Sequence, residues 1–181
     1  GDGFSATEIR GKKFGVIGLG RIGQRVGEIA LGFGAKVSYW SRNRKKEAEK
    51  EGIKYESIDN LVKTSDFISL HALTTKETEG ILDAKRLNSL KSGSVVLNVS
   101  GMEQVDLSAL EERLAKKDIV FLLDHPDEMK PEDVKRLAKL QNCVIYPPIG
   151  YISQEARILK QEIFVANLEN FLKGKPTNKV N

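Results

Sequence analysis

The stretch KFGVIGLGRIGQRVGEI, residues 13–29, decides the fold. It begins with a short apolar run, passes through Gly18, Gly20 and Gly23, and continues with the pattern of an amphipathic helix. Between a strand and a helix, the first glycine permits a tight turn, the second lets the backbone approach a pyrophosphate, and the third lets the helix pack closely. The stretch therefore predicts a dinucleotide-binding turn; a glycine-rich turn without a ligand is the alternative. No Gly-Lys-Ser/Thr follows, which disfavours a P-loop nucleotidase.

Apolar β-branched runs alternate with amphipathic segments along the rest of the chain. We expect strands at residues 13–17, 35–40, 66–71, 94–98, 119–124 and 142–146. We expect helices at residues 22–33, 44–51, 58–63, 84–90, 107–116, 131–140 and 154–172. This alternation predicts an α/β fold of the Rossmann type, a doubly wound, mostly parallel sheet with helices on both faces. The continuous apolar runs at 95–97 and 119–123 suit strands buried on both sides.

Length and composition indicate one globular domain. The chain has 181 residues, of which 40% are apolar and 30% charged, and it shows no internal repeat and no dividing linker. We therefore expect a single dinucleotide-binding domain over residues 1–181. One cysteine, Cys143, allows neither an internal disulfide nor a cysteine-based zinc site, and we assign no metal site. We expect a cytoplasmic protein, because no secretory signal is visible and the longest apolar runs are too short to cross a bilayer.

The charge of the chain bears on nucleic-acid binding. The formal net charge is +4, but the basic residues are scattered among 25 acidic ones and are not gathered on one face. The densest basic run, residues 42–46, is followed by Glu47, Glu49 and Glu51, as in a solvated helix with paired charges. The sequence thus disfavours nucleic acid as a partner.

The end of the second strand bears on the choice of cofactor. An NAD site usually has an acidic residue there, about 20 residues beyond the glycines, to accept a hydrogen bond from the ribose 2′-hydroxyl. The sequence instead reads Tyr39-Trp40-Ser41-Arg42, with Arg44 close behind. A hydroxyl and two cations suit a 2′-phosphate, and a repelling carboxylate is missing. We therefore predict that NADP(H) is preferred to NAD(H); the alternative is that these arginines face water.

The sequence resembles the nucleotide-binding domain of the D-isomer-specific 2-hydroxyacid dehydrogenases. The resemblance covers nearly the whole chain and is carried by motifs in a fixed order. These are residues 8–13, the glycine turn, and residues 65–71, 75–78, 90–98, 105–110 and 167–176. The tract at residues 39–42 is most similar to the glyoxylate and hydroxypyruvate reductase branch. The resemblance implies NADP or NAD as the cofactor.

The resemblance also implies a catalytic set that this sequence lacks. In the family, an arginine holds the substrate carboxylate, a histidine exchanges the proton and a glutamate orients that histidine. The aligned positions hold Gly101, Pro148 and Asp127 respectively. We therefore assign no catalytic residue and expect family chemistry near background. The family's substrate domain is expected to be absent from residues 1–181.

The same alignment implies cofactor contacts beyond the glycine turn. Arg21 and Ile22 would lie along the pyrophosphate. Ala72, Leu73 and Thr78 would lie beside the path from adenosine to nicotinamide, with Leu73 in place of a family proline. Val99 and Ser100 would lie near the nicotinamide ribose and Asp124 near the carboxamide.

Other reactive side chains have weaker claims to a role. His125 should lie at the carboxyl end of a strand, but a loop histidine without a catalytic role is the favoured interpretation. His71 is interpreted as structural. Cys143 is interpreted as a small buried hydrophobe, because no basic partner adjoins it.

Three functions remain open from the sequence. The first is a cofactor-binding domain without efficient hydride transfer of its own. The second is an active 2-hydroxyacid or 2-oxoacid oxidoreductase that takes its substrate domain or its acid/base from another chain. The third is an interaction module with an empty nucleotide site. Family relatives pair through this domain, so a homodimer is expected.

Overall fold

The computed structural model describes residues 7–179 of the chain. The chain divides into two compact units, Gly1–Pro147 and Pro148–Asn181. The first unit contains the whole sheet, and the second contains one long helix.

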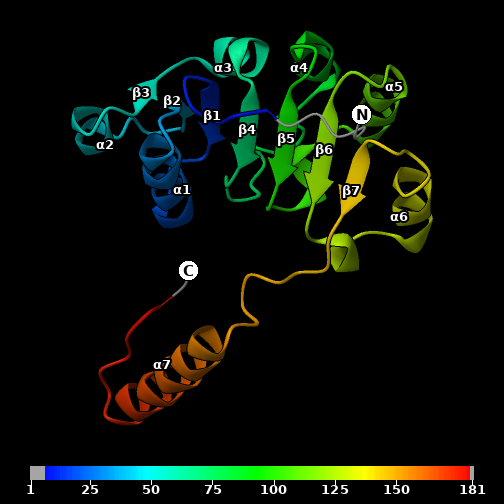
Figure 1. Cartoon of the computed structure of the whole chain (residues 1–181). Coiled ribbons are helices and arrows are strands. Elements are labelled where there is room, and N and C mark those ends of the chain that lie inside the picture. The colour runs from blue at the N-terminus through cyan, green and yellow to red at the C-terminus, as the bar shows by residue number, and fades with distance from the viewer. Residues whose placement is uncertain (1–6, 180–181) are drawn as a thin grey trace. The chain divides into compact units, whose positions relative to one another are not determined.

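A seven-stranded sheet forms the centre of the first unit, in the order β3-β2-β1-β4-β5-β6-β7 (Figure 1). All six neighbouring pairs are parallel. The strands are β1 Lys13–Ile17, β2 Lys36–Trp40, β3 Lys54–Tyr55, β4 Phe67–Leu70, β5 Val95–Asn98, β6 Val120–Leu123 and β7 Cys143–Ile145. The predicted Rossmann-type sheet is confirmed, and the six expected strands are present within one residue of their predicted ends. Only β3 was not expected from the sequence.

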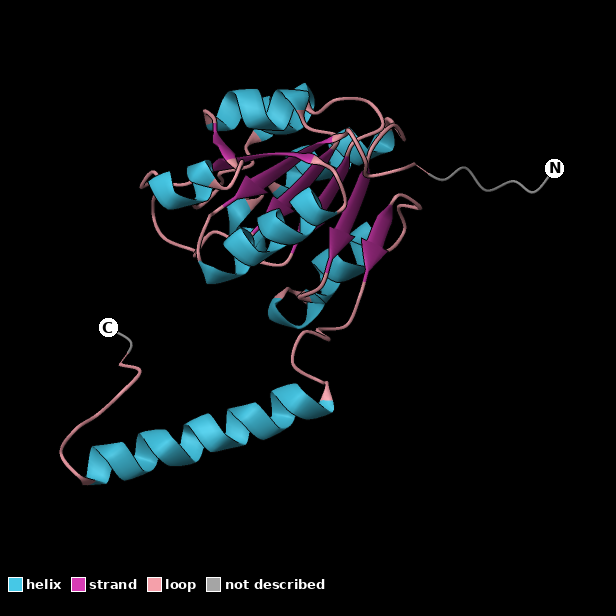
Figure 2. Ribbon diagram, turned by 60° about the vertical axis from the view of Figure 1, so that its left-hand side comes forward, coloured by secondary structure: helices cyan, strands magenta, loops and turns pink. Residues whose placement is uncertain are grey.

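Helices cover both faces of this sheet (Figure 2). They are α1 Arg21–Gly32, α2 Lys46–Lys50, α3 Ile58–Thr64, α4 Ala84–Ser89, α5 Leu107–Ala115 and α6 Pro131–Leu137, with short 3-10 turns at Met102–Gln104 and Pro126–Glu128. Ser57, Asp83 and Asp106 cap α3, α4 and α5, each side-chain oxygen accepting from a backbone N–H in the first turn. These caps explain why the three helices begin where the sequence predicts.

Two apolar clusters hold the layers together, one on each face. On one face, Val16, Val37 and Tyr39 pack with Ala30 of α1 and Ile53. The other cluster is larger and joins side chains of β1, β4, β5 and β6 to those of α3, α4 and α5. Neighbouring residues of β1 alternate between the two, since Val16 belongs to one cluster and Ile17 to the other.

Burial in the central strands is less even than their apolar sequences predict. Val96 of β5 and Phe121 and Leu123 of β6 are buried. The alternate side chains are only partly buried within the described residues: Val95, Leu97, Val120 and Leu122. The expectation that these strands are buried on both sides therefore holds for one face only.

The second unit consists mainly of α7, Gln154–Leu172, whose bounds agree with the prediction. The Ser153 hydroxyl caps it by accepting from the Ala156 N–H at 3.1 Å. No side chain of α7 is buried by its own unit. Within residues 7–179, none of the helices has both the length and the apolar character needed to cross a membrane.

Candidate dinucleotide site

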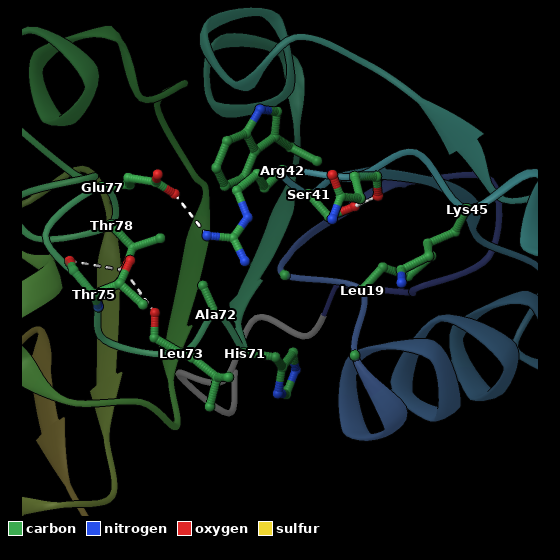
Figure 3. A pocket seen from close by; sticks show the side chains of 14 residues that line it. Leu19, Ser41, Arg42, Lys45, His71, Ala72, Leu73, Thr75, Glu77 and Thr78 are labelled. Atoms are coloured by element: carbon green, nitrogen blue, oxygen red, sulfur yellow. Dashed lines mark hydrogen bonds and ion pairs between the residues drawn. The ribbon is translucent and has the colours of Figure 1, made fainter. Parts of the chain in front are cut away.

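The site lies where the topology of the sheet reverses. From β1 the chain continues through α1 toward β2, whereas β4, on the other side of β1, leads away toward β5. Crevices beyond the carboxyl ends of strands at such a switch point are where open α/β sheets bind ligands. A pocket of about 300 Å³ lies there (Figure 3). Its lining consists of Gly18, Leu19, Gly20, Trp40, Ser41, Arg42, Asn43, Lys45, His71, Ala72, Leu73, Thr75, Glu77 and Thr78.

The glycine turn is held tightly against the strands beneath it. Gly18 has φ +94°, and its N–H donates to the Trp40 carbonyl at 2.8 Å. A β-carbon on Gly18 would lie 2.4 Å from the Ala72 nitrogen, and one on Gly23 would lie 2.1 Å from the Gly18 oxygen. Both positions therefore require glycine for close packing of backbone on backbone.

Gly20 differs from the other two glycines of the turn. A β-carbon on Gly20 would meet no atom within 4 Å, and Gly20 lines the pocket. It precedes α1, and its position carries no side-chain cap, so the first N–H groups of the helix are left for another acceptor. Open space beside Gly20, together with uncapped N–H groups at the start of α1, fits a pyrophosphate. Arg21 and Ile22 lie in this first turn, both exposed.

The loop after β2 brings positive charge to the pocket. Arg42 and Lys45 line it, together with Ser41 and Asn43. The loop is fixed by two bonds: the Ser41 hydroxyl donates to the Asn43 carbonyl at 2.6 Å, and the Lys45 N–H donates to the Tyr39 hydroxyl at 2.6 Å. Two cations and a hydroxyl-bearing turn at this end fit the 2′-phosphate of NADP(H).

Arg44 has a different place from the one expected. Its guanidinium donates to both carboxylate oxygens of Glu49 at 2.7 Å and lies 5.3 Å from the centre of the Tyr55 ring. The hydrogen bond from Arg44 lowers the pKa of Glu49, which also accepts from the Tyr39 hydroxyl at 3.0 Å. Arg44 is not among the residues that line the pocket, and its guanidinium pairs with Glu49 of α2.

The loop after β4 forms the opposite wall. Ala72, Leu73, Thr75 and Thr78 line the pocket there (Figure 3). The Thr78 hydroxyl donates to the Leu73 carbonyl at 2.6 Å and accepts from the Thr75 N–H at 2.9 Å, which closes a tight turn. The predicted contacts Ala72, Leu73 and Thr78 are thus brought together with Gly18, Gly20, Ser41 and Arg42 around one pocket.

Val99, Ser100 and Asp124 lie further along the same sheet edge, outside the residues that line this pocket. Val99 and Ser100 follow β5, and the Ser100 hydroxyl donates to the Leu70 carbonyl at 3.2 Å, tying the end of β5 to β4. Asp124 follows β6, and its Oδ1 is buried without a hydrogen-bond partner among the described residues. Nε2 of His125 lies 3.5 Å from this oxygen.

Comparison with known proteins decides the family. Residues 1–150 match the family described as D-isomer specific 2-hydroxyacid dehydrogenase, NAD binding domain. The chain belongs to this family. It is the family's NAD-binding domain, as the resemblance predicted.

Similar sequences include a glyoxylate reductase and a hydroxypyruvate reductase. The chain is 41% identical to a glyoxylate reductase of Thermococcus litoralis over 98% of its own length and 54% of that protein. It is 36% identical to a hydroxypyruvate reductase of Blautia hydrogenotrophica over 98% of its length and 56% of that protein. The chain thus spans about half the length of these curated relatives.

Similar solved structures carry either cofactor. A D-lactate dehydrogenase from Lactobacillus jensenii with NAD⁺ has a TM-score of 0.87 and 29% identity, over 100% of this chain and 58% of that one. An acyclic imino acid reductase in complex with NADPH and D-Arg has a TM-score of 0.85 and 34% identity, over 99% of this chain and 57% of that one. Relatives of this fold therefore bind NAD⁺ or NADPH.

Gly101, Asp127 and Pro148 are the three residues that the sequence resemblance aligns with the family's catalytic positions. A β-carbon on Gly101 would lie 2.2 Å from the Glu103 carboxylate and 3.1 Å from the Thr74 hydroxyl, so Glu103 occupies the space where a longer side chain would begin. Asp127 lies in an exposed 3-10 turn, 3.9 Å from Nδ1 of His125. Pro148 lies in the second unit.

Two further side chains of the dehydrogenase domain were expected to be structural. Cys143 is 8% exposed in β7, and burial raises the pKa of its thiol to about 11, which agrees with a buried hydrophobe. His71 lines the pocket, which its interpretation from sequence did not include. Its Nε2 lies 2.7 Å from the Ser69 hydroxyl, and burial lowers its pKa to about 4, so the ring is neutral at physiological pH.

Several pocket residues could not be assigned from the sequence. Lys45 was grouped with a solvated helix, and Thr75 and Glu77 belonged to a family motif without an assigned contact. The basic run at residues 42–46 was the only sequence feature that pointed to Lys45. Which side chains of that run face the pocket depends on the turn that the bond from the Lys45 N–H to the Tyr39 hydroxyl fixes. Among residues 7–179, no cluster of three or more potential ligands could hold a metal ion.

Burial of the His71 ring predicts that the free energy of unfolding depends on pH. Between pH 6.5 and about 4 the unfolded chain binds a proton at His71 that the folded protein does not, so the free energy of unfolding falls as the pH falls through this window. We expect a His71→Gln variant to lose less stability than the unsubstituted protein between pH 7 and pH 4.5, by about 1–2 kcal/mol after allowance for partial exposure. Urea unfolding at both pH values measures the difference.

Titration of the carboxylates is common to both proteins, so it cannot produce the expected difference in stability between them. The pKa of Asp66 is lowered, its bonds to Lys91 and the Lys13 N–H outweighing the opposing effect of burial. Its contribution is therefore present above its ordinary pKa and lost as the pH falls below it, in both proteins alike. Equal losses for the two proteins between pH 7 and pH 4.5 would show that the His71 ring accepts a proton freely in the folded state.

Proposed function

We propose that this domain binds NADP(H) in preference to NAD(H) and does not by itself transfer hydride efficiently. The observation that carries the preference is the pair of cations, Arg42 and Lys45, at the end of β2, where no β2 carboxylate lies to accept from a 2′-hydroxyl. The glycine turn and the uncapped start of α1 would hold the pyrophosphate. When bound, the nicotinamide would supply or accept a hydride.

The second half of the proposal rests on the aligned catalytic positions. Losing a general acid/base typically slows a reaction by about 10²–10⁴-fold, and losing one preorganised electrostatic partner by about 10²–10³-fold. Gly101 and Pro148 offer neither a charge nor a titrating group, and Asp127 is shorter than the glutamate it replaces. NADPH oxidation with glyoxylate or hydroxypyruvate should therefore stay near background. A turnover that survives stringent purification would refute this half.

The cofactor preference is tested with two arginines that differ in their surroundings. Arg42→Ala should weaken NADPH binding by about 10–100-fold, because a hydrogen bond to a charged group contributes about 1.5–3 kcal/mol, and should change NADH binding by less than about threefold. Quenching of Trp40, the only tryptophan and part of the pocket lining, gives both dissociation constants, with calorimetry as the second method.

Arg44→Ala is the matched control for this experiment. It removes the same charge from the same loop, but from a guanidinium bound to Glu49 outside the pocket. We expect less than about a threefold change for either cofactor, since exposed ion pairs contribute about 0–1 kcal/mol. If Arg44→Ala weakened NADPH binding more than Arg42→Ala did, and left NADH binding unchanged, the 2′-phosphate contact would belong to Arg44 and not to Arg42.

A second candidate function is an active 2-oxoacid reductase that uses a substrate domain or an acid/base from another chain. The 41% identity to a glyoxylate reductase favours it. Mixing the protein with such a partner should then give NADPH-dependent turnover that neither shows alone.

We also propose a homodimer in a reducing cytoplasmic setting. The resemblance to relatives that pair through this domain supports the dimer, and the unpaired thiol of Cys143 supports the setting. Sedimentation equilibrium measures the dimer directly; a single species at 20.1 kDa at high concentration would oppose it.

A further inference from the structure

An ion pair crosses the pocket from one wall to the other. Nη1 of Arg42, from the loop after β2, lies 2.8 Å from Oε2 of Glu77, from the loop after β4 (Figure 3). The two residues are 35 positions apart in the sequence, and their side chains are 67% and 65% exposed. Glu77 is the only carboxylate among the described residues that line the pocket. The cation proposed to bind the 2′-phosphate therefore already has an anionic partner.

The backbone around Glu77 is held in a rigid turn. The Thr78 and Glu79 N–H groups donate to the Thr75 carbonyl at 3.0 and 2.9 Å. The Thr78 hydroxyl joins the same turn to the Leu73 carbonyl. The turn therefore fixes the backbone of Glu77 at the pocket wall, from which its side chain reaches Arg42.

A carboxylate and a phosphate compete for one guanidinium. When a 2′-phosphate binds Arg42, the guanidinium must leave Glu77 or share itself between two anions that repel each other. A 2′-hydroxyl carries no charge, so NADH binding makes no such demand on Arg42. Breaking the pair is inexpensive because both partners are exposed to water.

We infer that Glu77 is a specificity-determining residue, which holds Arg42 across the pocket and lowers the affinity for the 2′-phosphorylated cofactor. This inference rests on the proposed function, because it assumes that the pocket binds NADP(H) through Arg42. Glu77 then opposes Arg42, and the balance of the two sets how strongly the domain prefers NADPH to NADH.

Glu77→Gln should tighten NADPH binding by about three- to fivefold and leave NADH binding within about twofold. The gain should shrink as salt rises, because the Debye length falls from about 8 Å at 0.15 M to about 3 Å at 1 M. Dissociation constants are measured by Trp40 quenching and calorimetry. Glu79→Gln is the matched control: it removes the same charge two residues away, from a side chain outside the pocket lining, and should change neither constant.

A double-mutant cycle tests whether Glu77 acts through Arg42. In the Arg42→Ala background, Glu77→Gln should no longer tighten NADPH binding. A gain of equal size in both backgrounds would overturn the inference, and so would an unchanged NADPH affinity in Glu77→Gln alone. If the unsubstituted protein binds neither cofactor, the proposed function itself fails, whereas binding that ignores Glu77 refutes only this inference.

Discussion

Gly23→Ala should lower the free energy of unfolding by about 3 kcal/mol or more, whereas Gly20→Ala should leave it within about 0.5 kcal/mol of the unsubstituted value. A β-carbon on Gly23 would lie 2.1 Å from the Gly18 oxygen, which belongs to a backbone already fixed by its bond to Trp40. A β-carbon on Gly20 meets nothing, and its φ of −79° is one that alanine adopts readily. Urea unfolding of both variants measures these effects.

The same pair separates folding from binding. The methyl group of Gly20→Ala would project into the pocket where the pyrophosphate approaches the backbone, so we expect at least a tenfold loss of affinity for both NADPH and NADH. A Gly20→Ala protein that is fully stable and binds cofactor as tightly as before would show that the glycine turn does not hold the pyrophosphate.

The second large effect concerns stability away from the site. Arg113→Met should lower the free energy of unfolding by about 3 kcal/mol. Arg113 of α5 is 3% exposed; its guanidinium donates to the Leu87 and Leu90 carbonyls at 3.2 and 3.1 Å and pairs with Asp118. Removing it leaves buried carbonyls at the end of α4 short of a donor. Urea unfolding at pH 7 measures the loss.

Two comparisons test the origin of this loss. Arg113→Lys keeps the charge but lacks the fork that reaches both carbonyls, so it should recover only part of the stability. The hydrogen bond from Arg113 lowers the pKa of Asp118. The ionised Asp118 therefore adds to the free energy of unfolding above the ordinary pKa of an aspartate, and this contribution is lost as the pH falls below it. The Arg113→Met protein should lack this acid-dependent loss. A change below about 0.5 kcal/mol at pH 7 would refute the structural role.

The succession of strands and helices along the chain and the position of the glycine turn could be predicted because they depend on local pattern. Alternating apolar runs and helical segments leave few topologies once crossovers must be right-handed. The two-residue strand β3 escaped prediction because Lys54 and Tyr55 are both exposed and form no apolar run. It exists because β2 offers it a partner, which a single sequence does not reveal.

The lining of the pocket was predictable where a residue's neighbours in sequence fix its place or where the family resemblance covers it, as at Ala72, Leu73 and Thr78. Gly18 and Gly20 are residues of the first kind, because strand and helix geometry determine where the turn lies. Arg44 and Lys45 are adjacent, yet one binds Glu49 and the other lines the pocket. Their directions depend on contacts with Tyr39 and Glu49, which the sequence alone does not display.

Contacts between distant segments lay beyond prediction altogether. Glu77 meets Arg42 across the pocket, and Arg113 of α5 reaches the end of α4. Each such contact depends on how loops and helix ends are placed in space. Family motifs identified the segments that meet but not the pairs of atoms that touch.

The two edges of the sheet also bear on how the protein behaves at high concentration. Edge strands expose unpaired N–H and C=O groups that another chain can add to, which is a common route to aggregation. Here β3 has only two residues, one of them the lysine Lys54, and β7 has three. Neither edge offers a run of unpaired backbone long enough to recruit a strand from a neighbouring molecule. We therefore expect the first unit to resist edge-to-edge assembly.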